Sequence, residues 1–373
     1  MKILVVGNGF DLAHDLPTSY KDFLYFTDAF IEFKTERQVL GKQIPVKEDT
    51  KEKQLIIYLV ELFNKSSTDV HAQELINEID KLIENNKWIE HFKNINIAQG
   101  WIDFESEISQ VIQTFDELRV HLIYELRNSG KGVKLTPHQI AVLKPFIGQA
   151  SLITSTVTID SLKNTLLNDL NRLIRCLEIY LCDYVEKIPI KKKLSDIEEL
   201  DIHAVLSFNY TDTYRANYIA DATKIKCDFI HGKANIKNTK ETCNMVIGID
   251  EYLEGSDREY DTEYIQFKKF FQRIYKATGN NYVDWLQQIK PRPEERYFPD
   301  ETNIYIYGHS LDATDKDILA ALITAENTKT TIFYHNQEAL EKQIINLVKV
   351  ISEDELIHRT GIKKIIFQKT KET

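Results

Sequence analysis

Seven short apolar runs constrain the fold of this chain more than any other feature of its sequence. They are rich in β-branched and aromatic residues and lie at 2–8, 204–210, 227–232, 244–249, 303–311, 330–335 and 363–368. Near-continuous apolar character is typical of strands covered on both faces, as in the parallel sheets of α/β proteins. Helical patterns at 315–326 and 338–352 separate the last three runs. We therefore predict an α/β fold with a doubly wound, mostly parallel sheet.

The middle of the chain has a different pattern. Apolar residues recur there at three- and four-residue intervals, in the segments 52–66, 71–86, 101–127 and 159–187. This period predicts helices and indicates that a large, mostly α-helical insertion at 31–199 interrupts a core formed by 1–30 and 200–373. Within that core, residues 250–300 are polar, aromatic and punctuated by proline (KPRPEERYFPD), which predicts a lid-like surface insertion.

Charge and composition exclude several classes of protein. Fifty-seven acidic residues outnumber 47 basic ones, giving a net charge of -10, which argues against direct binding of nucleic acid. No stretch approaches the roughly 18 uncharged apolar residues of a membrane helix, so we expect no membrane association. The four cysteines form no C-x-x-C pair and no secretory signal is evident, which predicts a cytoplasmic protein with free thiols. No histidine or carboxylate set has the spacing of metal ligands, so no metal is expected.

Glycines and polar residues follow four of the predicted strands. These loops read Gly7-Asn8-Gly9-Phe10-Asp11, Asn209-Tyr210-Thr211-Asp212, His231-Gly232-Lys233 and Gly308-His309-Ser310-Leu311-Asp312. Ligands of open α/β sheets bind beyond the carboxyl ends of the strands, so the four loops are expected to converge on one edge. This convergence makes nucleotide binding there our leading interpretation.

Each feature also has a purely structural interpretation. Gly7 and Gly9 form either a tight turn or a phosphate loop, and the third glycine of the dinucleotide fingerprint is missing. Asn209 is either the N-cap of a helix over 212–222 or a site residue. His231 is either a satisfied buried histidine or a general base for a ribose hydroxyl or a water. For Asp103, capping of a helix is favoured over catalysis.

Five motifs, taken in order, resemble those of the AbiH family, bacterial proteins linked to abortive infection against phage. They are ILVVGNGFDLAHDLPTSYKDFL, WIDFE, SFNYTDT, IHG and IYGHSLDATDKDIL, and they span almost the whole chain. The resemblance implies a role in defence against phage.

A more distant resemblance links the same motifs to sirtuin-like NAD-consuming domains. It implies a Rossmann-like, sirtuin-like core with NAD as the substrate, in which Asn209 orients the ribose and the attacking water and His231 accepts a proton. The residues that it implies for cofactor binding are Gly7, Asn8, Gly9, Phe10, Asp11, Asp212, Gly232, Gly308, Ser310 and Asp315. The zinc cysteines of sirtuin deacetylases are absent, which argues against deacylation. Asp11 also replaces the loop serine, and Thr211 separates Tyr210 from Asp212.

The sequence therefore supports two functions. The first is an anti-phage effector that binds NAD or a related nucleotide and hydrolyses its nicotinamide–ribose bond. The alternative is a nucleotide-binding sensor or scaffold without hydrolase activity, which works with a partner effector. A nuclease ranks last, because the chain lacks a carboxylate metal cluster and basic charge. The expected partners are the nucleotide substrate and either further copies of the chain or a phage-derived trigger.

Overall fold

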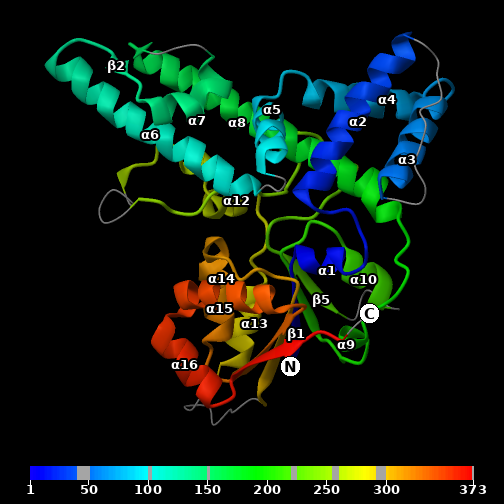
Figure 1. Cartoon of the computed structure of the whole chain (residues 1–373). Helices are drawn as coiled ribbons and strands as arrows, with labels where there is room; N and C mark the ends of the chain where they lie inside the picture. The colour runs from blue at the N-terminus through cyan, green and yellow to red at the C-terminus, as the bar shows by residue number, and fades with distance from the viewer. Residues whose placement is uncertain are drawn as a thin grey trace. The chain divides into compact units, whose positions relative to one another are not determined.

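The computed structural model of the chain describes residues 1–39, 51–99, 103–148, 152–219, 225–253, 260–290 and 300–371. The chain forms two compact units (Figure 1). Unit 1 comprises Met1–Thr18, Val185–Ala234 and Arg273–Thr373, and unit 2 comprises Ser19–Tyr184 and Asn235–Gln272. Both units are therefore built from segments that are distant in the sequence.

Unit 1 contains a six-stranded sheet in which every neighbouring pair is parallel. Its strands are β1 (Lys2–Val6), β4 (Ala204–Ser207), β5 (Lys226–Phe229), β6 (Thr302–Tyr307), β7 (Thr328–Tyr334) and β8 (Ile365–Lys369). The spatial order is β5-β4-β1-β6-β7-β8, so the chain builds the sheet outward from β1, first to one side and then to the other. The predicted parallel α/β sheet is confirmed.

Both faces of this sheet are covered, which explains the continuous apolar character of its strands. Ile3 and Val5 of β1 face a core shared with α13, α14, α15 and α16, whereas Leu4 and Val6 face a second core shared with α1, α9 and α10. Figure 1 shows these helices around the sheet. Their bounds are α1 (Asn8–Leu12), α9 (Ser195–Glu198), α10 (Thr213–Tyr218), α13 (Tyr282–Ile289), α14 (Lys316–Ile323), α15 (Gln337–Ile351) and α16 (Glu353–Gly361).

Unit 2 is mostly helical. Its helices are α2 (Tyr20–Val39), α3 (Lys51–Lys65), α4 (Val70–Ile83), α5 (Lys87–Gln99), α6 (Phe104–Asn128), α7 (Pro137–Ile147) and α8 (Thr156–Ile179), and α12 (Lys269–Tyr275) begins there. A two-stranded antiparallel ribbon joins β2 (Val133–Lys134) to β3 (Leu152–Ile153). Phe104 stacks on Tyr20 and on Phe92, with 4.0 Å between ring centroids in each pair. Aromatic packing of this kind holds helices that are distant in sequence together.

Unit 2 contains a predicted helix cap and a predicted strand. Asp103 is the N-cap of α6 and accepts a hydrogen bond from the backbone N–H of Glu105, so the capping interpretation is confirmed. The predicted strand at 244–249 is wrong. The run is buried, but it forms an isolated bridge between Ile249 and Lys268 in place of a strand, and the carbonyl of Ile247 accepts from the Gln272 side chain. Apolar character reports burial, which an extended segment shares with a strand.

The predicted lid at 250–300 is described only in part. Its described residues contain α12 and α13, while 254–259 and 291–299, which hold most of the proline-rich segment, lie outside the described residues. Trp101 and Ile102 of the WIDFE motif also lie outside them. Among the helices that the structure describes, none is long and apolar enough to span a membrane.

Candidate functional site

The four polar loops follow strands that are neighbours in the sheet. Because β5, β4, β1 and β6 are adjacent and parallel, their following loops lie at the same, carboxyl edge. The strand order also reverses there, since β1 pairs with β4 on one side and with β6 on the other. The predicted convergence of the loops is therefore present in the fold.

The glycines after β1 and β6 allow two loops to pack backbone to backbone. The N–H of Gly7 donates to Tyr307 O at 3.1 Å, and that of Gly9 donates to Gly308 O at 2.8 Å. A Cβ atom on Gly7 or on Gly9 would lie 2.7 Å from backbone atoms of the β6 loop. The glycines are thus required by loop packing, and the N–H groups of Gly7 and Gly9 are used within the protein. A role in phosphate binding remains a prediction.

Helix α1 has both buried and exposed side chains. Phe10 is fully buried and lies edge-on to Tyr307, with 5.8 Å between ring centroids, so its side chain does not reach a ligand. Asn8 is exposed and accepts a hydrogen bond from the Thr18 hydroxyl at 2.7 Å. Of the predicted cofactor residues in this loop, Asn8 is the one whose side chain faces solvent.

Asp11 is a buried carboxyl group that lacks a full set of partners. Its Oδ2 accepts a hydrogen bond from the Thr211 hydroxyl at 2.5 Å, whereas Oδ1 has no hydrogen-bond partner among the described residues. Burial raises the pKa of Asp11 to about 6, although the hydrogen bonds of Thr211, Thr213 and Asn209 lower it. A cavity of about 10 Å³ beside it is close to the room that one water needs. Burial thus favours the protonated form of this carboxyl group more than in an ordinary aspartate.

Asn209 ties the β4 loop to the β1 loop. Its side-chain amide donates to Gly7 O at 3.0 Å, and its backbone N–H donates to the Ser207 hydroxyl at 3.1 Å. The N-cap interpretation of Asn209 is wrong, because Asp212 occupies the N-cap of α10, which covers Thr213–Tyr218. Residues 220–222 of the predicted helix lie outside the described residues.

Asp212 lies between two cations. Its Oδ2 accepts from Lys233 Nζ at 2.6 Å and from Arg215 Nε at 2.9 Å. The pair with Lys233 joins the β4 loop to the β5 loop. Because both cations already neutralise this carboxylate, a ligand hydroxyl would compete with them for it.

His231 and Asp315 form a buried acid–histidine pair. The distance from His231 Nε2 to Asp315 Oδ1 is 3.0 Å, and the two residues are each 5% exposed. Gly232 follows with φ 79°, which turns the chain away directly after the histidine. Asp315 ends a short 3-10 turn (Ala313–Asp315) after β6. The predicted cofactor residue Asp315 thus lies against His231, and its role in binding a cofactor stays a prediction.

A second histidine, for which the sequence predicts no role, faces the same carboxylate. His309 Nε2 lies 3.6 Å from Asp315 Oδ2, an ion-pair distance, and His309 is 6% exposed. The ring of Phe208 packs edge-on against both histidines. The distance between ring centroids is 4.3 Å to His309 and 5.5 Å to His231. The glycine before His309 and the aspartate six residues later were the only signals that the sequence offered for it.

Ser310 differs from its neighbours because it is exposed, and its carbonyl accepts from Asn346 Nδ2 at 2.9 Å. The carboxyl edge therefore carries two buried polar groups. One consists of Asp11, Asn209 and Thr211, and the other of His231, His309 and Asp315. Among the residues that the structure describes, no cluster of three or more His, Cys, Asp or Glu side chains could hold a metal ion.

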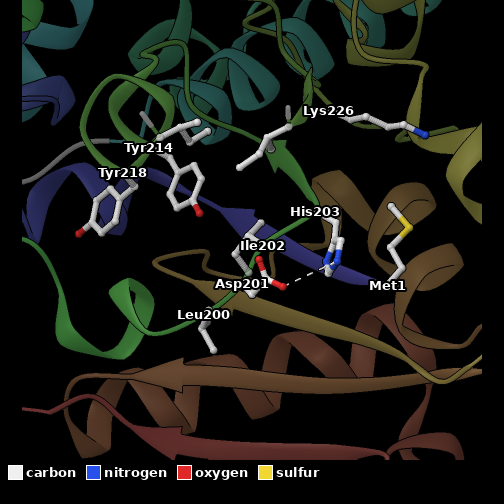
Figure 2. A pocket seen from close by; sticks show the side chains of 10 residues that line it. Met1, Leu200, Asp201, Ile202, His203, Tyr214, Tyr218 and Lys226 are labelled. Atoms are coloured by element: carbon white, nitrogen blue, oxygen red, sulfur yellow. Dashed lines mark ion pairs between the residues drawn. The ribbon is translucent and has the colours of Figure 1, made fainter. Parts of the chain in front are cut away.

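A much larger cavity, of about 710 Å³, lies at the opposite edge of the sheet. Figure 2 shows it among residues that precede or begin the strands, including Met1, Ile202 and Lys226. His203 and Asp201 form an ion pair there at 4.0 Å. Because this cavity adjoins the amino ends of β1, β4 and β5, it is separate from the loops of the candidate site.

The fold and the site define an α/β protein whose buried polar residues gather at the carboxyl edge of a parallel sheet. The family model described as bacteriophage abortive infection AbiH matches residues 3–336. The chain belongs to this family, and the membership suggests a role in abortive-infection defence against phage. No curated protein and no solved structure matches the chain.

Proposed function

We propose that this AbiH protein binds NAD, or a related nucleotide, at the carboxyl edge of its sheet and hydrolyses the nicotinamide–ribose bond. The observation that carries the proposal is the buried His231–Asp315 pair on the same edge as Asn209, where the strand order reverses at β1. When the six strands of this sheet are numbered in chain order, their spatial order is 3-2-1-4-5-6, which is the order of dinucleotide-binding sheets. The reversal point of such a sheet is where a dinucleotide binds.

The reaction requires mainly that the ribose and the attacking water are held in position. A water attacks the anomeric carbon of the nicotinamide ribose, the carbon–nitrogen bond breaks, and nicotinamide leaves as a neutral base. Because Nε2 of His231 donates to Asp315, the lone pair of the neutral imidazole is on Nδ1, which accepts the proton of the water. Asn209 holds the ribose and the water in place. The products are nicotinamide and an ADP-ribose with a free anomeric hydroxyl.

Different loops contact the ribose and the phosphates of the remaining nucleotide. Asp11 Oδ1, which has no partner among the described residues, accepts a ribose hydroxyl. The N–H groups of Gly7 and Gly9 are already engaged, so phosphate lies on the outer side of the loops, where Asn8 and Ser310 are exposed. In this proposal the conformation of the loops depends on Asp212, Gly232 and Gly308.

Nicotinamide release from NAD by purified protein tests the proposal. We expect Asn209→Ala and His231→Ala each to lower the rate by about 100-fold or more, the effect typical of losing a general base or a positioning group. His358→Ala is the matched control, because His358 is exposed on α16, and it should leave the rate unchanged. Release that survives both site substitutions at the wild-type rate would exclude this assignment.

A second function, a nucleotide sensor without hydrolase activity, is favoured by one observation. One N–H of the Asn209 side-chain amide donates to Gly7 O, so that donor is engaged before any ligand arrives. Equilibrium dialysis against NAD, followed by mass spectrometry of the bound fraction, separates the two functions. A sensor retains intact NAD for hours at a saturable site, whereas the hydrolase converts it to nicotinamide and ADP-ribose.

A further inference from the structure

The large cavity at the amino edge of the sheet, called the amino-edge cavity below, takes no part in the proposed hydrolysis. Its volume of about 710 Å³ lies within the range of about 300–1,000 Å³ that is typical of small-molecule sites. Every described residue that lines it belongs to unit 1. Its size and its place within one compact unit make it a candidate for a second ligand site.

The walls of the amino-edge cavity are mostly apolar. The branched aliphatic side chains that line it are Leu200, Ile202, Ile219 and Ile225. The described lining also contains one acidic residue, Asp201, and one basic residue, Lys226, whose formal charges offset each other. Because an apolar wall cannot replace the hydration of an ion, this lining favours an uncharged, mostly apolar molecule.

Tyr214 directs a hydroxyl group without a partner toward this cavity. The residue is 7% exposed, and its hydroxyl has no hydrogen-bond partner among the described residues. Figure 2 shows the hydroxyl pointing toward Ile202 and Asp201. Burial raises the pKa of Tyr214 to about 12, so the group keeps its proton and is a donor at neutral pH. A ligand with a hydrogen-bond acceptor would supply the missing partner.

The Tyr214 ring is held in place by its aromatic neighbours. It stacks on Tyr218, with 5.1 Å between ring centroids and 6° between ring planes, and Phe10 packs against both rings. The Tyr218 hydroxyl accepts from the Leu194 N–H at 2.6 Å and lies 2.8 Å from His14 Nε2. The hydroxyl of Tyr218 is therefore engaged within the protein, whereas that of Tyr214 is available. A donor that is already fixed lowers the ordering cost of binding.

We propose that the amino-edge cavity is a second ligand site, which binds an uncharged planar aromatic molecule that carries a hydrogen-bond acceptor. The aromatic body of the ligand packs against the aliphatic walls and the tyrosine rings, and its acceptor receives the O–H of Tyr214. Because the cavity is separate from the loops at the carboxyl edge, this proposal does not rest on the proposed hydrolysis.

Equilibrium dialysis of the full-length protein against quinoline and against naphthalene tests the proposal without NAD. Both probes are uncharged fused rings of the same shape at neutral pH, but quinoline has a ring nitrogen that accepts a hydrogen bond. We expect both probes to bind saturably to the wild type. In Tyr214→Phe, the dissociation constant of quinoline should rise by about 5-fold, the effect typical of one lost hydrogen bond, and that of naphthalene should not rise.

Two further variants locate the binding. Tyr260→Phe changes a tyrosine that is 80% exposed and should leave both dissociation constants unchanged. Ile225→Trp places a larger side chain in the amino-edge cavity and should abolish saturable binding of both probes. If this variant does not fold, as judged by circular dichroism, the comparison of the two probes in Tyr214→Phe decides the matter.

Three results would overturn the proposal. They are a wild type that binds neither probe, a folded Ile225→Trp variant that binds both as the wild type does, and a Tyr214→Phe variant in which quinoline weakens no more than naphthalene. Failure of nicotinamide release would overturn the proposed function alone, since the dialysis uses no nucleotide.

Discussion

Replacement of Gly308 by alanine is expected to lower the free energy of unfolding of unit 1 by more than about 4 kcal/mol. A Cβ atom at this position would lie 2.1 Å from Phe10 N and 2.4 Å from Gly9 C, both of which are backbone atoms. The backbone of Gly308 is also left-handed, at φ 68°, which adds about 1–2 kcal/mol for a residue with a side chain. The β1 loop would have to move away from the β6 loop to accept alanine.

Urea unfolding followed by circular dichroism measures this effect. The matched control is Gly361→Ala at the end of α16, where an added Cβ would meet nothing within 4 Å. That variant should be as stable as the wild type or slightly more stable, since alanine is the better helix former. If Gly308→Ala unfolds at the same urea concentration as Gly361→Ala, the result would contradict the close packing of the β1 and β6 loops.

Asp11→Asn is expected to change how stability depends on pH. The pKa of Asp11 is about 6 in the folded protein and 3.8 for an ordinary aspartate, so between these values the folded state binds more protons than the unfolded chain. Stability therefore falls as the pH rises from about 4 to about 6, and it stays lower above that range. At 1.36 kcal/mol for each pKa unit, the loss amounts to about 3 kcal/mol. Asparagine, which does not titrate, removes this loss.

The quantity to measure is the difference in unfolding free energy between Asp11→Asn and the wild type at pH 4, 5, 6 and 7. Any constant effect of the substitution on packing cancels when values at different pH are compared. Because the unfolded aspartate is already more than half ionised at pH 4, we expect the difference to shift in favour of the variant by about 2.4 kcal/mol over this range. Asp300→Asn, an exposed aspartate, should give a constant difference. The same flat profile for Asp11→Asn would show that the carboxyl group is not desolvated.

The presence of an ionisable side chain at position 11 also bears on function. A neutral residue at this position would avoid the loss of stability, and Oδ1 has no partner among the described residues. Buried carboxyl groups with raised pKa values cluster at sites that bind or react. This supports a ligand that supplies the missing hydrogen bond, which in our proposal is a ribose hydroxyl.

The sequence could predict the sheet because its signal is local. Runs such as ILVV after Lys2 and IYIY after Asn303 are continuous, and continuity follows from coverage on both faces. The convergence of the four loops then followed from parallel strands alone. The run at 244–249 shows the limit of this signal, because it is apolar and buried but forms an isolated bridge in place of a strand.

The arrangement of the site could not be predicted to the same degree. The engagement of the Gly9 N–H by Gly308 O depends on two loops that are about 300 residues apart in the chain. The pairing of Asp315 with both His231 and His309 likewise depends on the strand order, which sequence periodicity does not encode. Residue types at strand ends identified the site, but the partners of each side chain required the three-dimensional structure.

A crystal structure of the His231→Ala variant soaked with NAD tests the central claim most directly, because this variant should bind the nucleotide without consuming it. We predict density for NAD at the carboxyl edge of β4, β1 and β6, with its nicotinamide ribose beside Asn209 and a ribose hydroxyl on Asp11. Density in the cavity between Met1, His203 and Tyr218, or an empty carboxyl edge at saturating NAD, would contradict the account.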